Sequence, residues 1–245
     1  MKRGFSMLSP RYSDMSTHTD DDLVSTLQFS DSFFPLGSYS LSFGIETLSQ
    51  LGLVKGSDDV SSILSVFLEQ LSTLDCVALR GSFSAAGEND LRLLVAIDRK
   101  LASFKNVREF SEASRRTGRA LLRTVRALKK TGILSSFWNE VESGKAPSNY
   151  AVCLAIACST LGIGEERAVI LLLYTSAVSL LGASVRLGSV THVQAQQILH
   201  STKDELMNCA RRSTAIAWRS MHAFSPMLDV MGMQHVYLQS RMFYC

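Results

Sequence analysis

The apolar residues of this chain recur at the spacing of an α-helix over most of its length. In one long segment they occupy positions i, i+3, i+4 and i+7, the pattern that places one helix face against a core. These residues are Val60, Ile63, Leu64, Phe67, Leu68, Leu71, Leu74 and Ala78. No segment stands out in which apolar and polar residues alternate, as they would in a half-buried strand. The pattern therefore predicts an all-α fold.

Helix start and stop signals give approximate bounds for the other helices. Ser57 is the predicted N-cap of the long helix described above, and later helices are predicted over residues 89–104, 107–131, 133–143, 147–161, 165–187, 193–222 and 225–245. Residues 1–21 are rich in Ser, Thr and Asp and predict a disordered tail. No repeat or linker divides the remainder, so residues 22–245 predict one globular domain of roughly eight to ten packed helices.

Composition indicates a well-buried protein in a reducing compartment. The chain is 46% hydrophobic and 19% charged, which is typical of a globular domain. Its five cysteines form no C-x-x-C pair, and residues 1–22 lack the apolar stretch of a secretory signal. We therefore expect reduced cysteines and a cytoplasmic location.

One uncharged stretch, residues 168–185, reaches the length of a membrane span. It contains Tyr174 and several Ser, Thr and Gly residues, and it has no clear basic flank or aromatic belt. A helix buried on all sides in the centre of the domain is the better interpretation, and we expect no membrane partner.

The motifs of common active sites are absent from the sequence. The five histidines are scattered, with no H-x-x-x-H pair to hold a metal, and there is no G-x-S-x-G nucleophile turn. Gly162-Ile163-Gly164 is followed by Glu165 and Glu166, whose charge would repel a phosphate. We therefore expect no catalytic residues, no metal site and no cofactor.

Positive charge is concentrated between residues 92 and 130, where twelve basic residues face three acidic ones. Arg115, Arg119, Arg123 and Arg126 fall on one helical face. They form either a solvated face or a docking face for an acidic protein surface. Nucleic acid is disfavoured as a partner because no aromatic residues are interleaved and no nucleic-acid-binding motif matches.

The final segment, residues 225–245, has the signals of a capped helix. Ser225 is a candidate N-cap, Pro226 suits the first helical position, and Asp229 lies in the first turn, where the helix dipole favours an anion. Apolar residues follow at helical spacing: Met227, Val230, Met231, Met233, Tyr237, Leu238 and Met242. Such a helix packs either on its own domain or on another protein.

A second segment, residues 27–46, predicts a rigid corner between two helices. Helix one should end before Pro35, because the residue before a proline is disfavoured in the α conformation. Glu46 falls in the first turns of the next helix. Asp31, Tyr39 and Glu46 are then either turn and cap residues or part of a recognition surface.

Together these segments resemble the UreF-type urease accessory proteins. The family's opening pattern, D-S-x-F-P-x-G-S-[YF]-x-x-S-x-G-[LI]-E, matches Asp31 through Glu46, and its closing pattern is followed from Pro226 to Cys245. Ser114 through Leu122 is similar to its R-x-x-G-x-x-L-L helix. The chain departs from the family at His192 and Val236, which replace a glutamine and a glutamate.

The resemblance implies an all-α homodimer without enzymatic activity. Such proteins are adaptors in nickel insertion that bridge a nickel-carrying, UreG-type accessory GTPase to a second, UreD/UreH-type accessory protein and to apo-urease. An alternative is a regulator of the GTPase, in which an arginine of the basic helix acts in trans. By motif, the partner-binding residues would be Asp31, Pro35, Tyr39, Glu46, Asp229, His235 and Arg241. Of these, Tyr39 and Arg241 match positions associated with the ordered tail and GTPase recruitment.

Overall fold

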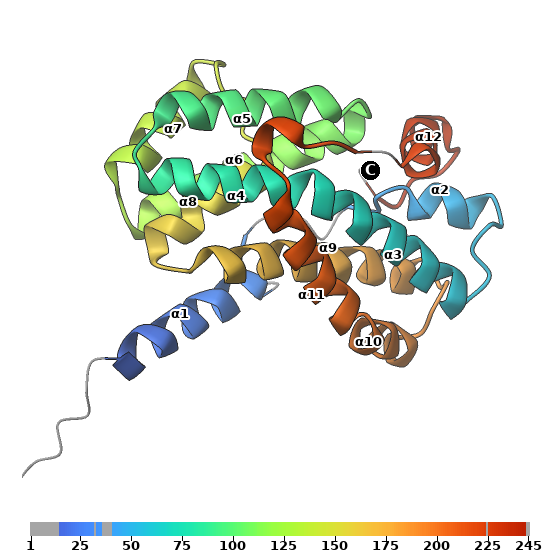
Figure 1. Cartoon of the computed structure of the whole chain (residues 1–245). Coiled ribbons are helices and arrows are strands. Elements are labelled where there is room, and N and C mark those ends of the chain that lie inside the picture. Colours follow the sequence, from blue (N-terminus) through green and yellow to red (C-terminus); the bar gives the residue numbers. More distant parts are fainter. Residues whose placement is uncertain (1–14, 32, 36–40, 224, 244–245) are drawn as a thin grey trace, which may run out of the picture.

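The protein is a bundle of α-helices (Figure 1). The computed structural model describes residues 15–31, 33–35, 41–223 and 225–243, with side chains from residue 22 onward. These residues contain no β-strand, and the helices share one large hydrophobic core. The predicted all-α class is confirmed.

The helices follow one another with short connections. Their bounds are α1 (Met15–Ser30), α2 (Ile45–Gln50), α3 (Ser57–Thr73), α4 (Asp75–Gly87), α5 (Leu91–Phe104), α6 (Arg108–Leu128), α7 (Gly132–Glu142), α8 (Tyr150–Leu161), α9 (Glu165–Arg186), α10 (His192–Ser201), α11 (Lys203–Arg212) and α12 (Pro226–Gln234), followed by the 3₁₀ turn His235–Tyr237.

Two predicted helices are each divided in the structure. The helix predicted to begin at Ser57 is interrupted at Leu74, where the backbone angles depart from ideal helical values (φ −116°, ψ −77°), and its N-cap is Gly56. The helix predicted over residues 193–222 breaks at Thr202 and ends at Arg212. Apolar spacing continues across both breaks, so periodicity alone does not reveal them.

The first helix begins within the segment predicted as an N-terminal tail. Helix α1 begins at Met15, so residues 15–21 are helical. Residues 1–14 lie outside the described part of the chain.

Helix α8 forms the centre of the bundle and packs against α4 and α6. Every residue from Ala151 to Cys158 is buried. Helix α6 approaches it at Gly118, where a Cβ atom would lie 2.1 Å from the carbonyl oxygen of Ser148. Only a residue without a side chain permits this contact.

The start of α8 is fixed by a buried carboxylate from α5. Asp98 accepts hydrogen bonds from the backbone amides of Ser148 (2.7 Å) and Asn149 (2.9 Å) and from the Asn149 side chain (2.7 Å). These bonds satisfy amides that have no partner within the helix. Asp98 therefore ties α5 to the central helix.

Two segments are long and apolar enough to cross a membrane, residues 57–87 and α9. More than half of each is buried against the rest of the protein, as in the core helices of a bundle. The expectation that α9 is buried on all sides is wrong, because Tyr174 and Val178 are each 40% exposed. One face of α9 therefore lies at the surface.

Candidate functional site

The end of the segment 27–46, which leads into α2, lies beside the C-terminal tail, where α2 packs against α12 (Figure 1). Gly44 begins α2 with φ +85°, a conformation that favours glycine. A Cβ atom there would lie 3.4 Å from the Met231 Cβ and 3.5 Å from the Leu228 carbonyl oxygen. The glycine thus allows the backbone of the corner to approach the tail helix.

A second glycine, Gly232, allows α12 to pack closely against the start of α6. A Cβ atom at Gly232 would lie 2.5 Å from the Phe110 ring and 2.9 Å from a Val107 methyl group. On the same helix, Leu228 is buried in the core. Helix α12 is therefore packed on its own domain through its inner face.

His235 lies at the centre of the contacts between the tail and the domain, and its side chain is completely buried. Its Nε2 is 2.7 Å from Glu46 Oε2 on α2, and its Nδ1 is 2.6 Å from Glu109 Oε2 on α6. Each ring nitrogen of His235 therefore faces a carboxylate oxygen. Charge-assisted hydrogen bonds of this kind are stronger than neutral ones.

Glu46 also binds the backbone beyond the tail helix. Its Oε1 accepts a hydrogen bond from the Met242 amide at 2.6 Å, and its Oε2 accepts one from the Phe243 amide at 3.2 Å. The Glu46 side chain is only 1% exposed, so these bonds compensate for its removal from water. The Glu46 carboxylate therefore holds two separate parts of the tail, the His235 side chain and the backbone of residues 242–243.

Further contacts hold the last described residues. Arg241 Nη1 donates to Glu109 Oε1 at 3.2 Å, and Gln50 Nε2 donates to the Ser240 carbonyl oxygen at 2.9 Å. The Arg186 guanidinium lies 4.3 Å from the centre of the Phe243 ring. We call Glu46, Glu109, His235 and Arg241 the tail network.

Three of the predicted site residues, Glu46, His235 and Arg241, therefore converge in this network. Asp229 lies apart from it and faces Lys105 instead. Burial raises the pKa of the Asp229 carboxyl, and the Lys105 charge opposes this shift. The last helix ends at Gln234, earlier than predicted, and Ser225 makes no side-chain cap hydrogen bond. The chain turns there so that the backbone of Met242 reaches Glu46.

The remaining predicted residues lie before α2. Asp31 Oδ1 accepts a hydrogen bond from the Phe33 amide at 2.7 Å, which makes Asp31 a turn residue. Pro35 is exposed. Tyr39 lies outside the described residues, so its predicted role in recognition stays a prediction.

Sequence reasoning missed Glu109, Gln50 and Arg186. Glu109 is one of three acidic residues between residues 92 and 130, where basic residues predominate, and this rarity could have marked it as a candidate site residue. Nothing in the sequence pairs it with His235, which is 126 residues away. The contact between Arg186 and Phe243 depends on how the tail folds back, which the sequence does not show.

The outer face of the tail is apolar and exposed. Tyr237 is 85% exposed and Met227 is 64% exposed. The exposed apolar residues of this tail surface are Met227, Val230, Met233, Val236, Tyr237 and Met242. Large apolar surfaces of this kind mark sites of protein interaction.

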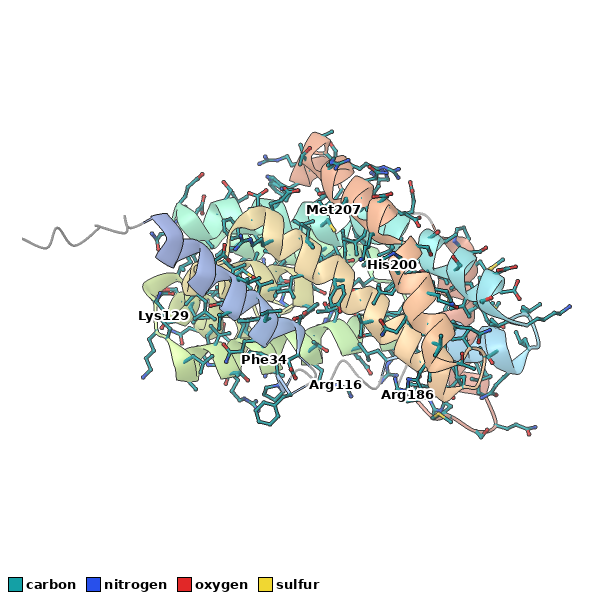
Figure 2. The ribbon with its side chains drawn as sticks, turned by 90° about the horizontal axis from the view of Figure 1, so that it is seen from below. Phe34, Arg116, Lys129, Arg186, His200 and Met207 are labelled. Atoms are coloured by element: carbon teal, nitrogen blue, oxygen red, sulfur yellow. The ribbon has the colours of Figure 1, made fainter. Side chains whose placement is uncertain are left out.

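The basic face of α6 is only partly free. Arg115, Arg119 and Arg123 are exposed, and Arg119 lies 3.4 Å from Glu142 of α7. Arg126 is half-buried, with its guanidinium 4.7 Å from the centre of the Trp138 ring. Figure 2 shows Lys129, just after α6, pointing away from the bundle. The predicted face therefore consists of three exposed arginines and one held by Trp138.

In the part of the chain that the structure describes, no group of three or more His, Cys, Asp or Glu side chains could hold a metal ion. The four described cysteines are buried and free. The tail network is suited to holding the C-terminal tail in a defined position.

Comparison with known proteins identifies relatives of this chain. The UreF family model matches residues 54–203, more than half of the chain. A urease accessory protein UreF of Trichodesmium erythraeum is 29% identical over 221 residues, which cover 90% of this chain and 95% of that protein. UreF proteins of Yersinia enterocolitica and Yersinia pseudotuberculosis are 25% identical over 226 residues, covering 91% of this chain and 97% of each.

Proposed function

The chain belongs to the UreF family of urease accessory proteins, with a role in urease maturation, and we propose that it acts there as a non-enzymatic adaptor. In this role it recruits the nickel-carrying, UreG-type accessory GTPase to a second, UreD/UreH-type accessory protein and to apo-urease. The adaptor is a cytoplasmic homodimer, and nickel is held by its partners.

The observation that carries this proposal is the tail network. Glu46 and Glu109 hold His235 from two helices, and Glu46 also holds the Met242 amide. Ordering the tail costs conformational entropy, and these charge-assisted bonds offset that cost. A tail fixed in this way presents its apolar residues as a preformed surface, which lowers the cost of binding a partner.

Two surfaces of different chemistry support binding to more than one partner. The tail surface is apolar, whereas the exposed arginines of α6 favour an acidic protein surface. We assign the tail surface and Arg241 to the GTPase, and Arg115, Arg119 and Arg123 to an acidic partner. Asp31, Pro35 and Tyr39 belong to the same recognition region in this proposal.

Light scattering on size-exclusion fractions tests the adaptor role. The purified chain is measured alone and then with the accessory GTPase and the second accessory protein of its own organism. We expect a dimer that shifts to a defined larger complex. A protein whose mass stays unchanged with both partners would refute the proposal.

Variants of the chain separate the two surfaces. Arg241→Ala should leave a folded protein that no longer recruits the GTPase, while the matched control Arg211→Ala on α11 should behave as wild type. Charge reversal at Arg115, Arg119 and Arg123 should weaken a salt-dependent interaction. Unchanged binding at low salt by this triple variant would exclude the basic docking face.

A second candidate function is regulation of GTP hydrolysis in trans. Arg115 and Arg123 are exposed and, among the described residues, have no ion-pair partner, so either could reach a bound nucleotide. An arginine supplied in trans accelerates hydrolysis by about 10³–10⁵-fold. GTP turnover by the partner GTPase, measured with the wild-type chain and with Arg115→Ala and Arg123→Ala, decides between this activity and simple recruitment.

A further inference from the structure

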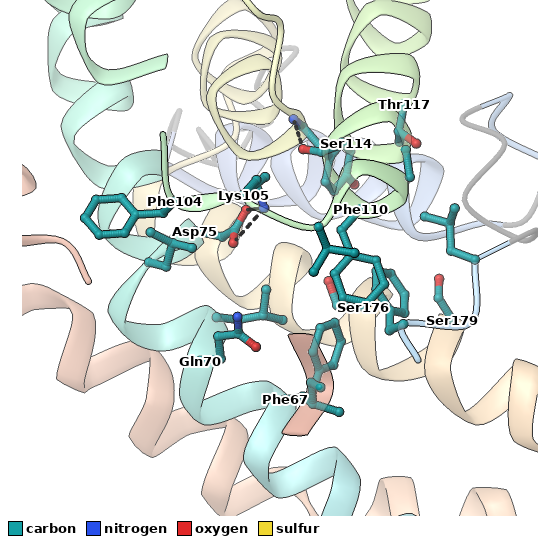
Figure 3. A pocket seen from close by; sticks show the side chains of 18 of the residues that line it. Phe67, Gln70, Asp75, Phe104, Lys105, Phe110, Ser114, Thr117, Ser176 and Ser179 are labelled. Atoms are coloured by element: carbon teal, nitrogen blue, oxygen red, sulfur yellow. Dashed lines mark hydrogen bonds and ion pairs between the residues drawn. The ribbon is translucent and has the colours of Figure 1, made fainter. Parts of the chain in front are cut away.

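A cavity of about 110 Å³ lies between α3, the start of α6, α9 and the tail helix (Figure 3). Four phenylalanine side chains line it, together with Leu71, Leu172 and Leu228. The phenylalanines are Phe43, Phe67, Phe104 and Phe110. None of the four residues of the tail network lines this cavity.

Several polar side chains of the wall make no hydrogen bond within the described residues; they include the buried Thr117 and the half-exposed Ser176, Ser179 and Gln70. Ser176 and Ser179 are one turn apart on α9, and Gln70 lies on α3. Within the described residues, none of the three side chains makes a hydrogen bond, although helical serines commonly bond to the carbonyl one turn earlier. In Figure 3, Gln70 and Ser179 lie on opposite sides of the Phe67 and Phe110 rings.

The charges at one end of the cavity disfavour an anion. Lys105 Nζ lies 2.9 and 3.1 Å from the two Asp75 oxygens, so this ammonium already has a partner. Asp229 adds a second carboxylate to the same wall. Two carboxylates against one ammonium leave an excess of negative charge.

The lining, rather than the volume, favours a single ring. An enclosed apolar cavity of about 150 Å³ accepts a benzene molecule. This cavity is smaller, about 110 Å³, but it is partly open to solvent, so a bound ring can extend beyond it. Aromatic walls favour an aromatic guest, and a few convergent polar groups orient it. The Ser176 and Ser179 hydroxyls are half-exposed and bond to no protein group within the described residues, so they are available to a ligand that carries a hydrogen-bonding group.

We propose that this cavity binds one neutral, hydroxylated aromatic ring, a small molecule of the phenol class. The ring packs against the phenylalanines, and its hydroxyl bonds to Ser176 or Ser179. Because Leu228 of α12 forms part of the wall, the bound ring also contacts the tail helix.

Titration of the full chain with p-cresol and with toluene, followed by ligand-observed NMR, tests this proposal. We expect saturable binding of one molecule per chain, with p-cresol bound more tightly than toluene. Ser176→Ala combined with Ser179→Ala should weaken p-cresol binding about 2- to 10-fold, the effect of one lost hydrogen bond, and leave toluene unchanged. Ser184→Ala on the same helix is the control, because its hydroxyl bonds to the Leu180 carbonyl and does not line the cavity.

Ser176→Leu tests the location by filling the cavity. It should abolish binding of both probes while the circular dichroism spectrum stays helical. 4-Hydroxybenzoate, the anionic counterpart of p-cresol, should bind at least about tenfold more weakly because of the Asp75 and Asp229 carboxylates. Absence of saturable binding by wild type, or binding that survives in a folded Ser176→Leu variant, would overturn the proposal.

Discussion

Replacing His235 with alanine removes the residue at the centre of the tail network. The substitution deletes two hydrogen bonds to carboxylates, at 2.6 and 2.7 Å, from a side chain that is fully buried. A hydrogen bond to a charged group contributes about 1.5–3 kcal/mol. Removing one partner from a buried ionic pair costs about 3–5 kcal/mol, because the other charge is left uncompensated. We therefore expect the seated tail to lose about 3–5 kcal/mol relative to the detached tail.

Amide hydrogen exchange followed by mass spectrometry measures this loss directly. Because 1.36 kcal/mol corresponds to a factor of ten, a loss of 3 kcal/mol should accelerate exchange over residues 226–243 by about 100-fold. Protection of α8 should persist, since it packs mainly against α4 and α6 and not against the tail helix. The control is His200→Ala, which changes an exposed histidine on α10. Wild-type protection of the tail in His235→Ala would refute the role assigned to the network.

Three further predictions concern the bundle. Gly118→Ala places a Cβ atom against the Ser148 carbonyl and should cost about 2 kcal/mol or more, lowering Tm by about 4–8 °C, whereas Gly182→Ala, with no atom within 4 Å, should not destabilise. Asp98→Ala leaves the amides at the start of α8 without an acceptor and should cost about 3 kcal/mol or more in urea unfolding; a smaller loss would exclude the capping role. Burial raises the pKa of the Cys76, Cys153 and Cys158 thiols, so less thiolate is present at a given pH and these residues should react with a disulfide reagent only as fast as the protein unfolds; rapid reaction in the native state would contradict their burial.

The helical fold could be predicted because each helix carries its own apolar period. The helical spacing places Phe67, Leu68 and Leu71 on one face, and all three are buried in the structure. The break at Leu74 could not be predicted, because the apolar spacing continues through it and the backbone change depends on how α3 and α4 pack. The same reason applies to the break at Thr202.

The site could be predicted in part. Motif resemblance selected Glu46, His235 and Arg241 from opposite ends of the chain, but it did not show that they touch. Their contact depends on Gly44 and Gly232, which allow α2 and α6 to approach the tail helix. Glu109 was not selected because its partner is distant in sequence, and its role appears only when α6 and the tail lie side by side.

In the proposed function, the seated tail recruits the GTPase. Gly232→Ala tests it most directly, because the added Cβ atom meets the Phe110 ring and changes the inner face of α12 without altering any exposed side chain. We would measure the affinity of this variant for the accessory GTPase, in the presence of the second accessory protein, beside wild type and the control Gly182→Ala. We expect at least a tenfold loss of affinity for Gly232→Ala, corresponding to about 1.4 kcal/mol, and none for the control. Wild-type affinity in a variant whose tail exchanges rapidly would contradict this proposal.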